Sequence, residues 1–505
     1  MFYKPSRERQ WDSWIFKHEE TYFMYYINVS EGGLRWDGIS LATSRDLVHW
    51  QEYGRVLDKD ADAVWLGTGM VQRVGDRFIM NYSLEKPAHY QRIYFAESVD
   101  LYHWKKIEGV RSAPDDVIYR AEPGESCDVM PRWDSLGVFD PLSGDPPPYY
   151  AFCSANARGT ATAGKSGVLG LATSMDGLNW TCLPPAFDDP EVFPTCEVPE
   201  YFCLNGRHYA LFCTSSYLGF RFDERADWAV GGTYYLVADE KTGPYRLPEG
   251  DPMLQGTRDH YMVCMNYVGR TFDDDGQRLY YHIWGEPTSD AWMGAVKRSA
   301  EVRPGTLELR YYEGNERLKG RVLLSEVRTE EWAEIFRAGV QPAVFWDLTD
   351  GEIAFGNNGS AMCLAHRGLE GVPETEAYTA LEDGRVLETE IRFAGRCAGL
   401  WFGTKKGERA CVALNGERQR AEFGYVQNGW GGNVLLRKEH YKDAEVRGGG
   451  RLRLLARRMF LEAYLDDRYL GGWRLTEDEL DPNRFGVYSE DSEGSFGGLT
   501  VWEMK

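Results

Sequence analysis

The stretch Ser44-Arg-Asp-Leu-Val-His-Trp50 has two further copies in the first part of the chain. These are Ser98-Val-Asp-Leu-Tyr-His-Trp104 and Ser174-Met-Asp-Gly-Leu-Asn-Trp180, which keep Ser, Asp and Trp at the same offsets. Each copy follows a short apolar run, at 39–42, 93–96 and 168–172 respectively. A repeat that is longer than a hairpin and made of short strands and turns is typical of a β-propeller.

Hairpin signals extend this pattern to about residue 320. The strongest is Asn205-Gly206, which stands between the apolar segments 201–204 and 209–213. Apolar hairpin openings near residues 11, 65, 133, 197 and 260 predict five units. The sequence therefore predicts a five-bladed β-propeller over residues 1–325, in which side chains from separate blades meet at a central funnel.

Beyond the propeller, residues 329–336 (Thr-Glu-Glu-Trp-Ala-Glu-Ile-Phe) combine a capping Thr with apolar residues at helical spacing. This pattern predicts a linker helix over 326–342. From 343 to 505 apolar and polar residues alternate within single strands and no blade repeat is present. The fold class predicted is all-β, a five-bladed propeller followed by a C-terminal antiparallel β-sandwich.

The composition of the chain disfavours some classes of partner and favours others. The 505 residues carry a net charge of −21, which disfavours nucleic acid or an anionic membrane as a partner. Aromatic residues make up 14% of the chain, and this high proportion favours β-strands and surfaces that stack on sugars. The start Met1-Phe-Tyr-Lys-Pro5 opens no apolar run, and the ten cysteines form no CxxC pair. We therefore expect a cytoplasmic protein with reduced thiols and no membrane span.

Three acidic residues stand where the innermost strand of a predicted blade begins. Asp12 precedes the first strand, Asp134 the third hairpin and Glu197 the fourth. Glycoside hydrolysis needs one carboxylate near the anomeric carbon and one carboxylic acid that protonates the leaving oxygen. Asp128 and Asp140 are alternatives to Asp134, which is preferred because residues 136–139 continue from it as a strand.

Around these acids the chain resembles the furanoside-cleaving propeller enzymes, above all glycoside hydrolase family 32, in the clan shared with families 43, 62 and 68. That family opens its first, third and fourth blades with Asn-Asp-Pro-Asn-Gly, Arg-Asp-Pro and Glu-Cys-Pro. The segments of this chain that resemble the family's blade openings are Trp11-Asp12-Ser13, Gly67-Thr-Gly69, Arg132-Trp-Asp134, Glu197-Val-Pro199 and Asp259-His-Tyr261. The resemblance continues into 457–464 and 486–488 of the predicted sandwich.

The resemblance implies a retaining, exo-acting β-fructofuranosidase-like hydrolase of short oligosaccharides. Asp12 would be the nucleophile, Glu197 the general acid/base and Asp134 the residue that stabilises the transition state through sugar hydroxyls. The substrate-binding residues expected beside them are Trp11, Trp14, Trp36, Arg132, Trp133, Asp259 and Tyr261.

Alternative functions remain at this stage. An arabinofuranosidase-like glycosidase could use the same three acids with inversion, and a carbohydrate-binding propeller could lack catalysis. The segment 159–166 matches the phosphate-loop pattern, but it leads into a strand instead of a helix. Neither a cofactor nor a metal is expected, and Glu125 and Asp128 have no second acidic cluster to share a metal with. The sequence leaves open whether the chain forms a homo-oligomer.

Overall fold

A computed structural model of the chain describes residues 3–30, 33, 35–87, 89–121, 131–158, 167–190, 192–193, 195–214, 231–257, 266–285, 290–325, 332–335, 352–366, 384–428, 434–475 and 478–505. The chain divides into two compact units, one made of 1–256 and 260–312, the other of 257–259 and 313–505. The division therefore falls at Tyr312, earlier than the expected boundary near residue 325. The described residues contain no helix with the length and apolarity that a membrane crossing requires.

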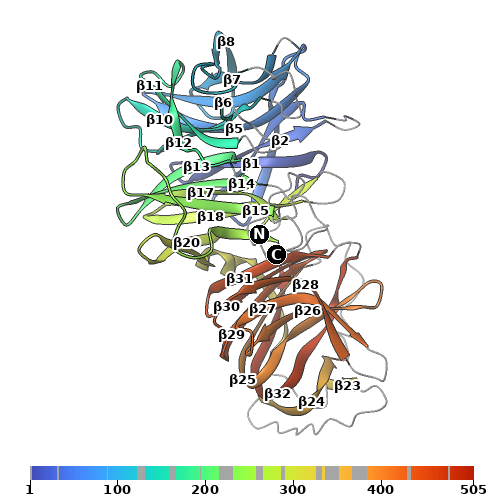
Figure 1. Cartoon of the computed structure of the whole chain (residues 1–505). Helices are drawn as coiled ribbons and strands as arrows, with labels where there is room; N and C mark the ends of the chain where they lie inside the picture. Colours follow the sequence, from blue (N-terminus) through green and yellow to red (C-terminus); the bar gives the residue numbers. More distant parts are fainter. Residues whose placement is uncertain are drawn as a thin grey trace. The chain divides into compact units, whose positions relative to one another are not determined.

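The N-terminal unit is built from antiparallel sheets whose strands follow one another in chain order (Figure 1). The four complete sheets are β1 (Arg9–His18), β2 (Thr21–Val29), β3 (Gly38–Ser44) and β4 (Trp50–Asp58); β5 (Trp65–Val74), β6 (Arg77–Lys86), β7 (His89–Ser98) and β8 (Lys105–Ser112); β9 (Trp133–Val138), β10 (Tyr149–Asn156), β11 (Gly167–Ser174) and β12 (Trp180–Phe187); β13 (Glu197–Leu204), β14 (Arg207–Thr214), β15 (Gly231–Ala238) and β16 (Met253–Thr257). A further antiparallel run consists of β17 (Asn266–Asp274), β18 (Gln277–Gly285), β20 (Lys297–Arg303) and β21 (Thr306–Tyr311), with β19 (Ala291–Met293) paired to β18.

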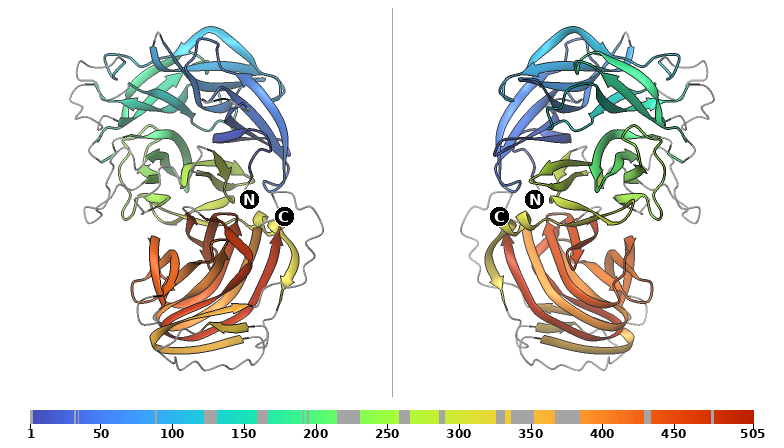
Figure 2. Two further views of the ribbon diagram at one scale, coloured as in Figure 1. Left: turned by 90° about the vertical axis from the view of Figure 1, so that its right-hand side faces the viewer. Right: turned by 90° about the vertical axis from the view of Figure 1, so that its left-hand side faces the viewer.

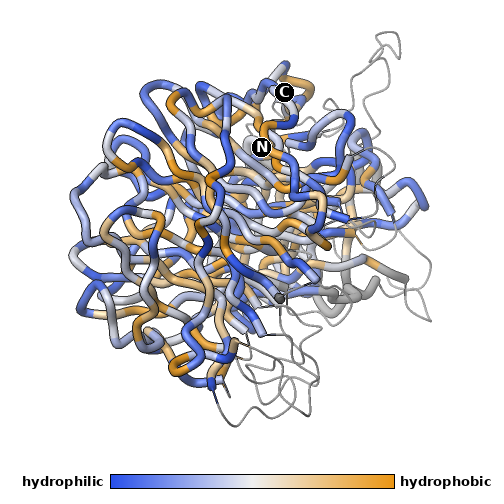
Figure 3. The backbone as a smooth tube through the Cα atoms, turned by 90° about the horizontal axis from the view of Figure 1, so that it is seen from above, coloured by the Kyte–Doolittle hydropathy of each residue, from blue (hydrophilic) through white to orange (hydrophobic). Residues whose placement is uncertain are grey.

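The first strands of these sheets form a ring. β1 contacts β5, β5 contacts β9, β9 contacts β13, β13 contacts β17, and β17 contacts β1 again. Hydrophobic clusters fill the space between neighbouring sheets, so that one packs β1–β3 against β5 and β6 and another packs β10 and β11 against β13–β15. Figure 2 shows the sheets of this unit in two further views, and the tube in Figure 3 shows hydrophilic residues on many of the peripheral turns. The fold is thus all-β and propeller-like.

The repeated Ser/Asp/Trp motif forms the turn between the third and fourth strands of the first three sheets. In the first copy the Ser44 hydroxyl accepts the backbone N–H of Leu47 at 2.9 Å, and Asp46 Oδ1 accepts that of His49 at 2.8 Å. Trp50 Nε1 donates to the Leu47 carbonyl, and Leu47 has a φ of 63°. The other two copies make the same hydrogen bonds. The Ser and Asp side chains therefore accept the backbone N–H groups of the turn, which stabilises it locally.

The C-terminal unit is a large antiparallel arrangement organised by two long strands. β25 (Gly384–Thr404) and β32 (Leu480–Met504) pair along most of their length. β25 pairs with β29 before Gly395 and with β26 after it, and Gly395 has a φ of 113°, which favours glycine. The remaining elements are η2 (Glu313–Leu318), β22 (Lys319–Leu324), β23 (Trp332–Ile335), β24 (Glu352–His366), β26 (Arg409–Asn415), β27 (Arg420–Asn428), β28 (Val434–Asp443), β29 (Gly448–Arg457), β30 (Phe460–Leu465) and β31 (Arg468–Arg474).

The structure contradicts the predicted linker helix where it describes that segment. Trp332–Ile335 forms strand β23, which pairs antiparallel with the end of β24, at Cys363–His366. The rest of 326–342 lies outside the described residues. A short helix is marginal by itself, whereas pairing with the existing strand β24 gives part of the backbone hydrogen-bond partners without helix nucleation.

The repeated turn gives a stability prediction. Partial burial opposes ionisation of Asp46, but the hydrogen bonds from His49 and Val48 prevail and lower its pKa to about 2. Because this pKa lies below that of the unfolded chain, the stabilisation is present above about pH 4 and is lost as pH falls toward 2. Asp46→Ala should lower the unfolding free energy by about 1–2 kcal/mol at neutral pH, as measured by urea titration.

Asp58→Ala is the matched control, because the exposed Asp58 carboxylate makes only a surface ion pair with Arg55 at 3.0 Å. Such a pair is worth about 0–1 kcal/mol. Equal losses in the two variants, or a loss in Asp46→Ala that persists at about pH 2, would contradict the role given to the turn.

Candidate active site

Each first strand of the N-terminal unit carries a β-bulge near its start. In β1 the register with β2 shifts between Gln10 and Ser13, and in β13 the register with β14 shifts between Glu197 and Glu200. Strands β5, β9 and β17 contain corresponding shifts. A bulge turns a side chain out of the regular alternation of a strand. The residues at these five bulges are Asp12, Thr68, Asp134, Glu197 and Tyr267.

These five side chains line one cavity of about 550 Å³. Their common placement has a backbone cost, since the residues that follow Asp134, Glu197 and Tyr267 all have positive φ, between 48° and 57°. Valine is rarely found in that region, yet two of the three are valines, Val198 and Val268. The bulges thus hold the backbone in a strained conformation that directs the polar side chains toward one space.

Asp12 is the most isolated of the three acids. Its Oδ2 accepts a hydrogen bond from the Thr68 hydroxyl, whereas its buried Oδ1 has no partner among the described residues. Burial raises the pKa of Asp12 to about 7, the Thr68 hydrogen bond opposes that rise, and the charges of Glu197 and Asp134 add to it. Asp12 is therefore a buried carboxyl group with a pKa near 7 and one unpaired oxygen, on a residue that lines the cavity.

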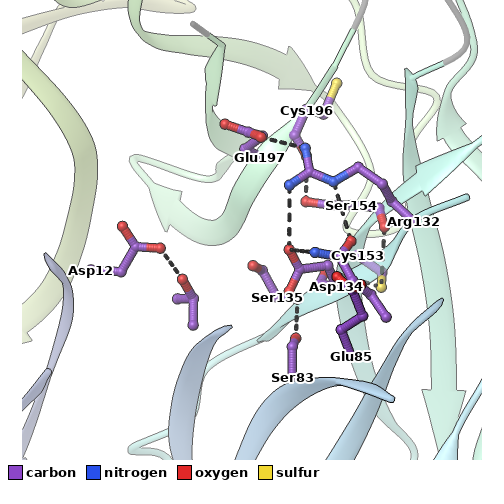
Figure 4. Close-up of polar contacts among 12 residues, drawn as sticks. Asp12, Ser83, Glu85, Arg132, Asp134, Ser135, Cys153, Ser154, Cys196 and Glu197 are labelled. Atoms are coloured by element: carbon purple, nitrogen blue, oxygen red, sulfur yellow. Dashed lines mark hydrogen bonds and ion pairs between the residues drawn. The ribbon is translucent and has the colours of Figure 1, made fainter. Parts of the chain in front are cut away.

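Arg132 joins the other two acids. Its guanidinium contacts Glu197 Oε1 through Nη1 and lies 3.5 Å from Asp134 Oδ2 through Nη2 (Figure 4). Gln91 donates to the same Asp134 oxygen at 3.2 Å. Burial raises the pKa of Asp134, and the nearby Arg132 charge opposes that rise. One guanidinium thus compensates two buried carboxylates.

Glu197 is held from both sides. The Tyr267 hydroxyl donates to its Oε2, opposite the Arg132 contact at Oε1. Behind it, the carbonyl of Cys196 accepts the Ser154 hydroxyl at 2.7 Å and fixes the start of β13. The orientation of Glu197 is therefore determined by groups from two neighbouring sheets, the one that begins with β9 and the one that contains β17.

Aromatic side chains form part of the cavity wall. Trp11 and Trp36 stack with their ring centroids 6.1 Å apart and an interplanar angle of 28°. Trp65 lies in the same wall and donates its indole N–H to Glu85 at 2.5 Å. Such flat apolar surfaces beside buried carboxylates suit the C–H faces and hydroxyl groups of a sugar ring.

The structure brings together six of the ten side chains that the sequence indicated. Two others, Trp14 and Trp133, lie elsewhere. Trp14 is only 2% exposed and packs against Tyr25 in the core, and Trp133 is fully buried with its indole N–H on the Ser112 hydroxyl at 2.9 Å. Trp133 is adjacent to Asp134 and faces the opposite side of β9, whereas the register shift between Gln10 and Ser13 puts Trp14 on a different face from Asp12. Asp259 and Tyr261 lie outside the described residues.

Further predictions have similar outcomes. Asp140, the alternative third acid, does not line this cavity and pairs with Lys241 at 2.8 Å. Asp128, Glu125 and the segment 159–166 lie outside the described residues. Within the part of the chain that is described, no group of His, Cys, Asp and Glu side chains could hold a metal ion.

Several cavity residues were missed from the sequence. Thr68 lies in the Gly67-Thr-Gly69 turn, where the small residues were noted but the hydroxyl was not. Tyr267 stands in an ordinary strand segment that carries no signal. The same is true of Gln91, which lies outside the cavity lining and donates to Asp134. Arg9, Arg35 and Trp65 also line the cavity. These residues can be recognised only from their positions in the folded ring, and the sequence shows neither the bulges nor the cavity lining.

Comparisons with known proteins identify structures that share this fold. No protein-family model and no curated protein sequence matches the chain. Solved structures do match over nearly its whole length. The Bombyx mori GH32 β-fructofuranosidase BmSUC1 is 13% identical with a TM-score of 0.64, covering 99% of this chain and 94% of its own.

Two further solved structures give the same result. Exo-inulinase from Aspergillus awamori is 13% identical with a TM-score of 0.63, and the match covers 100% of this chain and 97% of that one. Sucrose-6-phosphate hydrolase from Lactobacillus gasseri is 14% identical with a TM-score of 0.62, over 96% and 88% of the two chains. The predicted resemblance is confirmed at the level of fold: the chain has a propeller fold like that of glycoside hydrolase family 32.

The buried state of Asp12 gives a prediction about stability. Because its folded pKa is raised above that of the unfolded chain, the folded state loses stability as pH rises from about 4 to about 7. Asp12→Asn removes the buried charge and should raise the unfolding free energy above pH 7 by up to about 4 kcal/mol, at about 1.4 kcal/mol per pKa unit. Urea unfolding at about pH 8 and pH 4 measures the difference.

The exposed Asp58, changed to Asn, serves as the control and should show no pH-dependent gain. An Asp12→Asn gain of equal size at both pH values would mean that the amide improves packing and that the carboxylate charge is not the cause.

Proposed function

We propose that the chain is a retaining glycoside hydrolase that removes terminal fructofuranosyl groups from short oligosaccharides. The observation that carries the proposal is the convergence of Asp12, Asp134 and Glu197 on one cavity. The proposal rests further on the fold shared with β-fructofuranosidases and an exo-inulinase. We propose equally that the N-terminal unit is a five-bladed catalytic propeller and that the C-terminal unit is a β-sandwich.

In the proposed mechanism Asp12 is the nucleophile. Its carboxylate attacks the anomeric carbon, the bond to the leaving oxygen breaks, and Glu197 gives its proton to that oxygen. Glu197 then removes a proton from water, and the resulting hydroxide displaces Asp12 to release the sugar with retained configuration. The free Oδ1 of Asp12 and the fixed orientation of Glu197 support these two roles.

Asp134 would stabilise the positive charge that develops on the sugar ring in this reaction. A ring that approaches an oxocarbenium ion gains positive charge, which buried carboxylates stabilise more strongly than water does. Asp134 would also accept sugar hydroxyls. Protonation of Glu197 for the first step requires Arg132 to release Oε1, so substrate that enters beside Asp134 would have to compete for this guanidinium.

The extent of the cavity supports the proposed exo mode. Glu200 and Arg270, each 2% exposed, form an ion pair of 2.9 Å further along β13 and β17. They line a different cavity from the three acids. A cavity that ends before this ion pair is consistent with recognition of a terminal sugar, which supports the proposed exo mode.

A substrate screen with site variants tests the function. We expect hydrolysis of sucrose, short fructo-oligosaccharides or aryl β-fructofuranosides, and retained anomeric configuration in the first product seen by NMR. Asp12→Asn and Glu197→Gln should each lower kcat on the order of 10²–10⁴-fold. Glu301→Gln is the control, because this carboxylate lines neither cavity and binds Arg207 and Tyr209.

The outcomes separate the competing assignments. Inversion with an arabinofuranoside would replace the fructofuranosidase assignment with an arabinofuranosidase-like one. Sugar binding with no hydrolysis of any furanoside would indicate a binding protein. Undiminished hydrolysis in both acid variants would show that the reaction takes place elsewhere.

The pH dependence tests Asp12 separately. If Asp12 must be ionised to attack, kcat/KM should fall about tenfold per pH unit below the Asp12 pKa of about 7. The Thr68 hydrogen bond lowers that pKa, so Thr68→Val should move the acid limb to higher pH by roughly one unit. Thr68→Ser keeps the hydroxyl and should leave the limb in place. An acid limb that does not move in Thr68→Val would exclude Asp12 as its source.

A further inference from the structure

A second cavity, of about 380 Å³, lies within the N-terminal unit and shares no lining residue with the first. It is built from residues further along the same first strands. Trp14 stands two positions after Asp12, Met70 two after Thr68, Glu200 three after Glu197 and Arg270 three after Tyr267. The ring of strands therefore has a pocket on each side of the bulges.

The inner wall of the second cavity is rigid. Glu200 binds Arg270 through Oε2, and its Oε1 accepts both the N–H and the hydroxyl of Thr271 at 2.7 and 2.8 Å. Arg270 also donates to the Gly69 carbonyl at 3.0 Å. These bonds satisfy both carboxylate oxygens of Glu200, so the wall presents a preformed surface to whatever occupies the cavity.

Two buried donors in this wall have no acceptor. Among the described residues, none accepts a hydrogen bond from Trp14 Nε1 or from Arg278 Nε, although Arg278 Nη2 reaches Asp273 at 2.5 Å. The Trp14 side chain is only 2% exposed, so its N–H cannot be solvated from outside. Buried N–H groups are costly to leave unpaired. A molecule with acceptor oxygens in the cavity, which Trp14 and Arg278 both line, would supply the missing acceptors once neighbouring side chains uncover the two N–H groups.

The remaining lining restricts the chemistry of that molecule. Carboxylates of Asp140, Asp145 and Asp273 offer acceptor oxygens, although Asp140 is paired with Lys241 and Asp273 with Arg278. The edges of the largely covered Tyr201 and Phe272 rings add apolar surface. A ligand that donates hydroxyls, accepts through oxygen and presents a C–H face matches all three properties. We propose that this second cavity is a binding site for a neutral monosaccharide. Its volume falls in the range of small-ligand pockets.

The site does not depend on hydrolysis in the first cavity. Free monosaccharides are not cleaved by a glycosidase, so their binding can be measured whether or not the proposed function holds. The reporter is the Trp14 indole N–H, whose NMR resonance shifts when it gains an acceptor. Its signal is assigned by comparison with Trp14→Phe, in the full chain labelled with ¹⁵N at tryptophan indoles.

The experiment titrates fructose, glucose and arabinose up to about 100 mM into the full chain. We expect the Trp14 signal to shift to saturation with at least one sugar. Arg278→Met removes the second donor and should weaken this binding at least fivefold, whereas the sugar-dependent shift of the Trp36 signal, which reports on the first cavity, should be the same in this variant as in the unchanged chain. Arg310→Met is the matched control, since Arg310 pairs with Glu308 and lines neither cavity.

Two results would overturn the proposal. One is a Trp14 signal that no sugar moves. The other is a Trp14 shift that follows the same curve as Trp36 and is unchanged in Arg278→Met, because that would assign all binding to the first cavity. Absence of hydrolysis with a saturable Trp14 shift would reject the proposed function and retain the second site.

Discussion

The burial of three carboxylates around one cavity is the constraint on which the N-terminal unit depends. Like charges in a region of low dielectric repel one another and lose their hydration, so such a cluster opposes folding unless other groups compensate it. Arg132 does this for Glu197 and Asp134 by contacting both. Asp12 has only the Thr68 hydroxyl as a direct hydrogen-bond partner. Its raised pKa reflects the desolvation of the carboxylate that this one bond does not offset.

The bulges explain how residues from five strands can share this space. A regular strand alternates its side chains between two faces, so an acid and its flanking residues would be separated by the pleat. The bulge interrupts that alternation once in every first strand, at the same level of the ring. The hydrophobic clusters between adjacent sheets provide the packing energy that holds Ser135, Val198 and Val268 in left-handed conformations.

The sequence carried much of the fold and only part of the site. The Ser/Asp/Trp turn could be recognised because its hydrogen bonds are local, from Ser44 and Asp46 to backbone groups within three residues. The hairpin at Asn205-Gly206 was predictable for the same reason, since both residues adopt the positive φ that such turns need. The strand at Trp332–Ile335 was not, because its partner is distant in sequence. Trp14 was misplaced because the bulge after Asp12 changes which neighbours face the cavity.

Thr68, Gln91 and Tyr267 show the limit most clearly. None has a local motif, and each gains a role only because the ring closes and brings a carboxylate of another sheet within hydrogen-bonding distance. The same closure creates the Glu200–Arg270 pair beyond the bulges. Burial is the main cause of the raised pKa of Asp12, and the Arg270 charge is a smaller effect that opposes the rise. The Glu200–Arg270 pair thus belongs to the second cavity and also contributes to the electrostatics of Asp12.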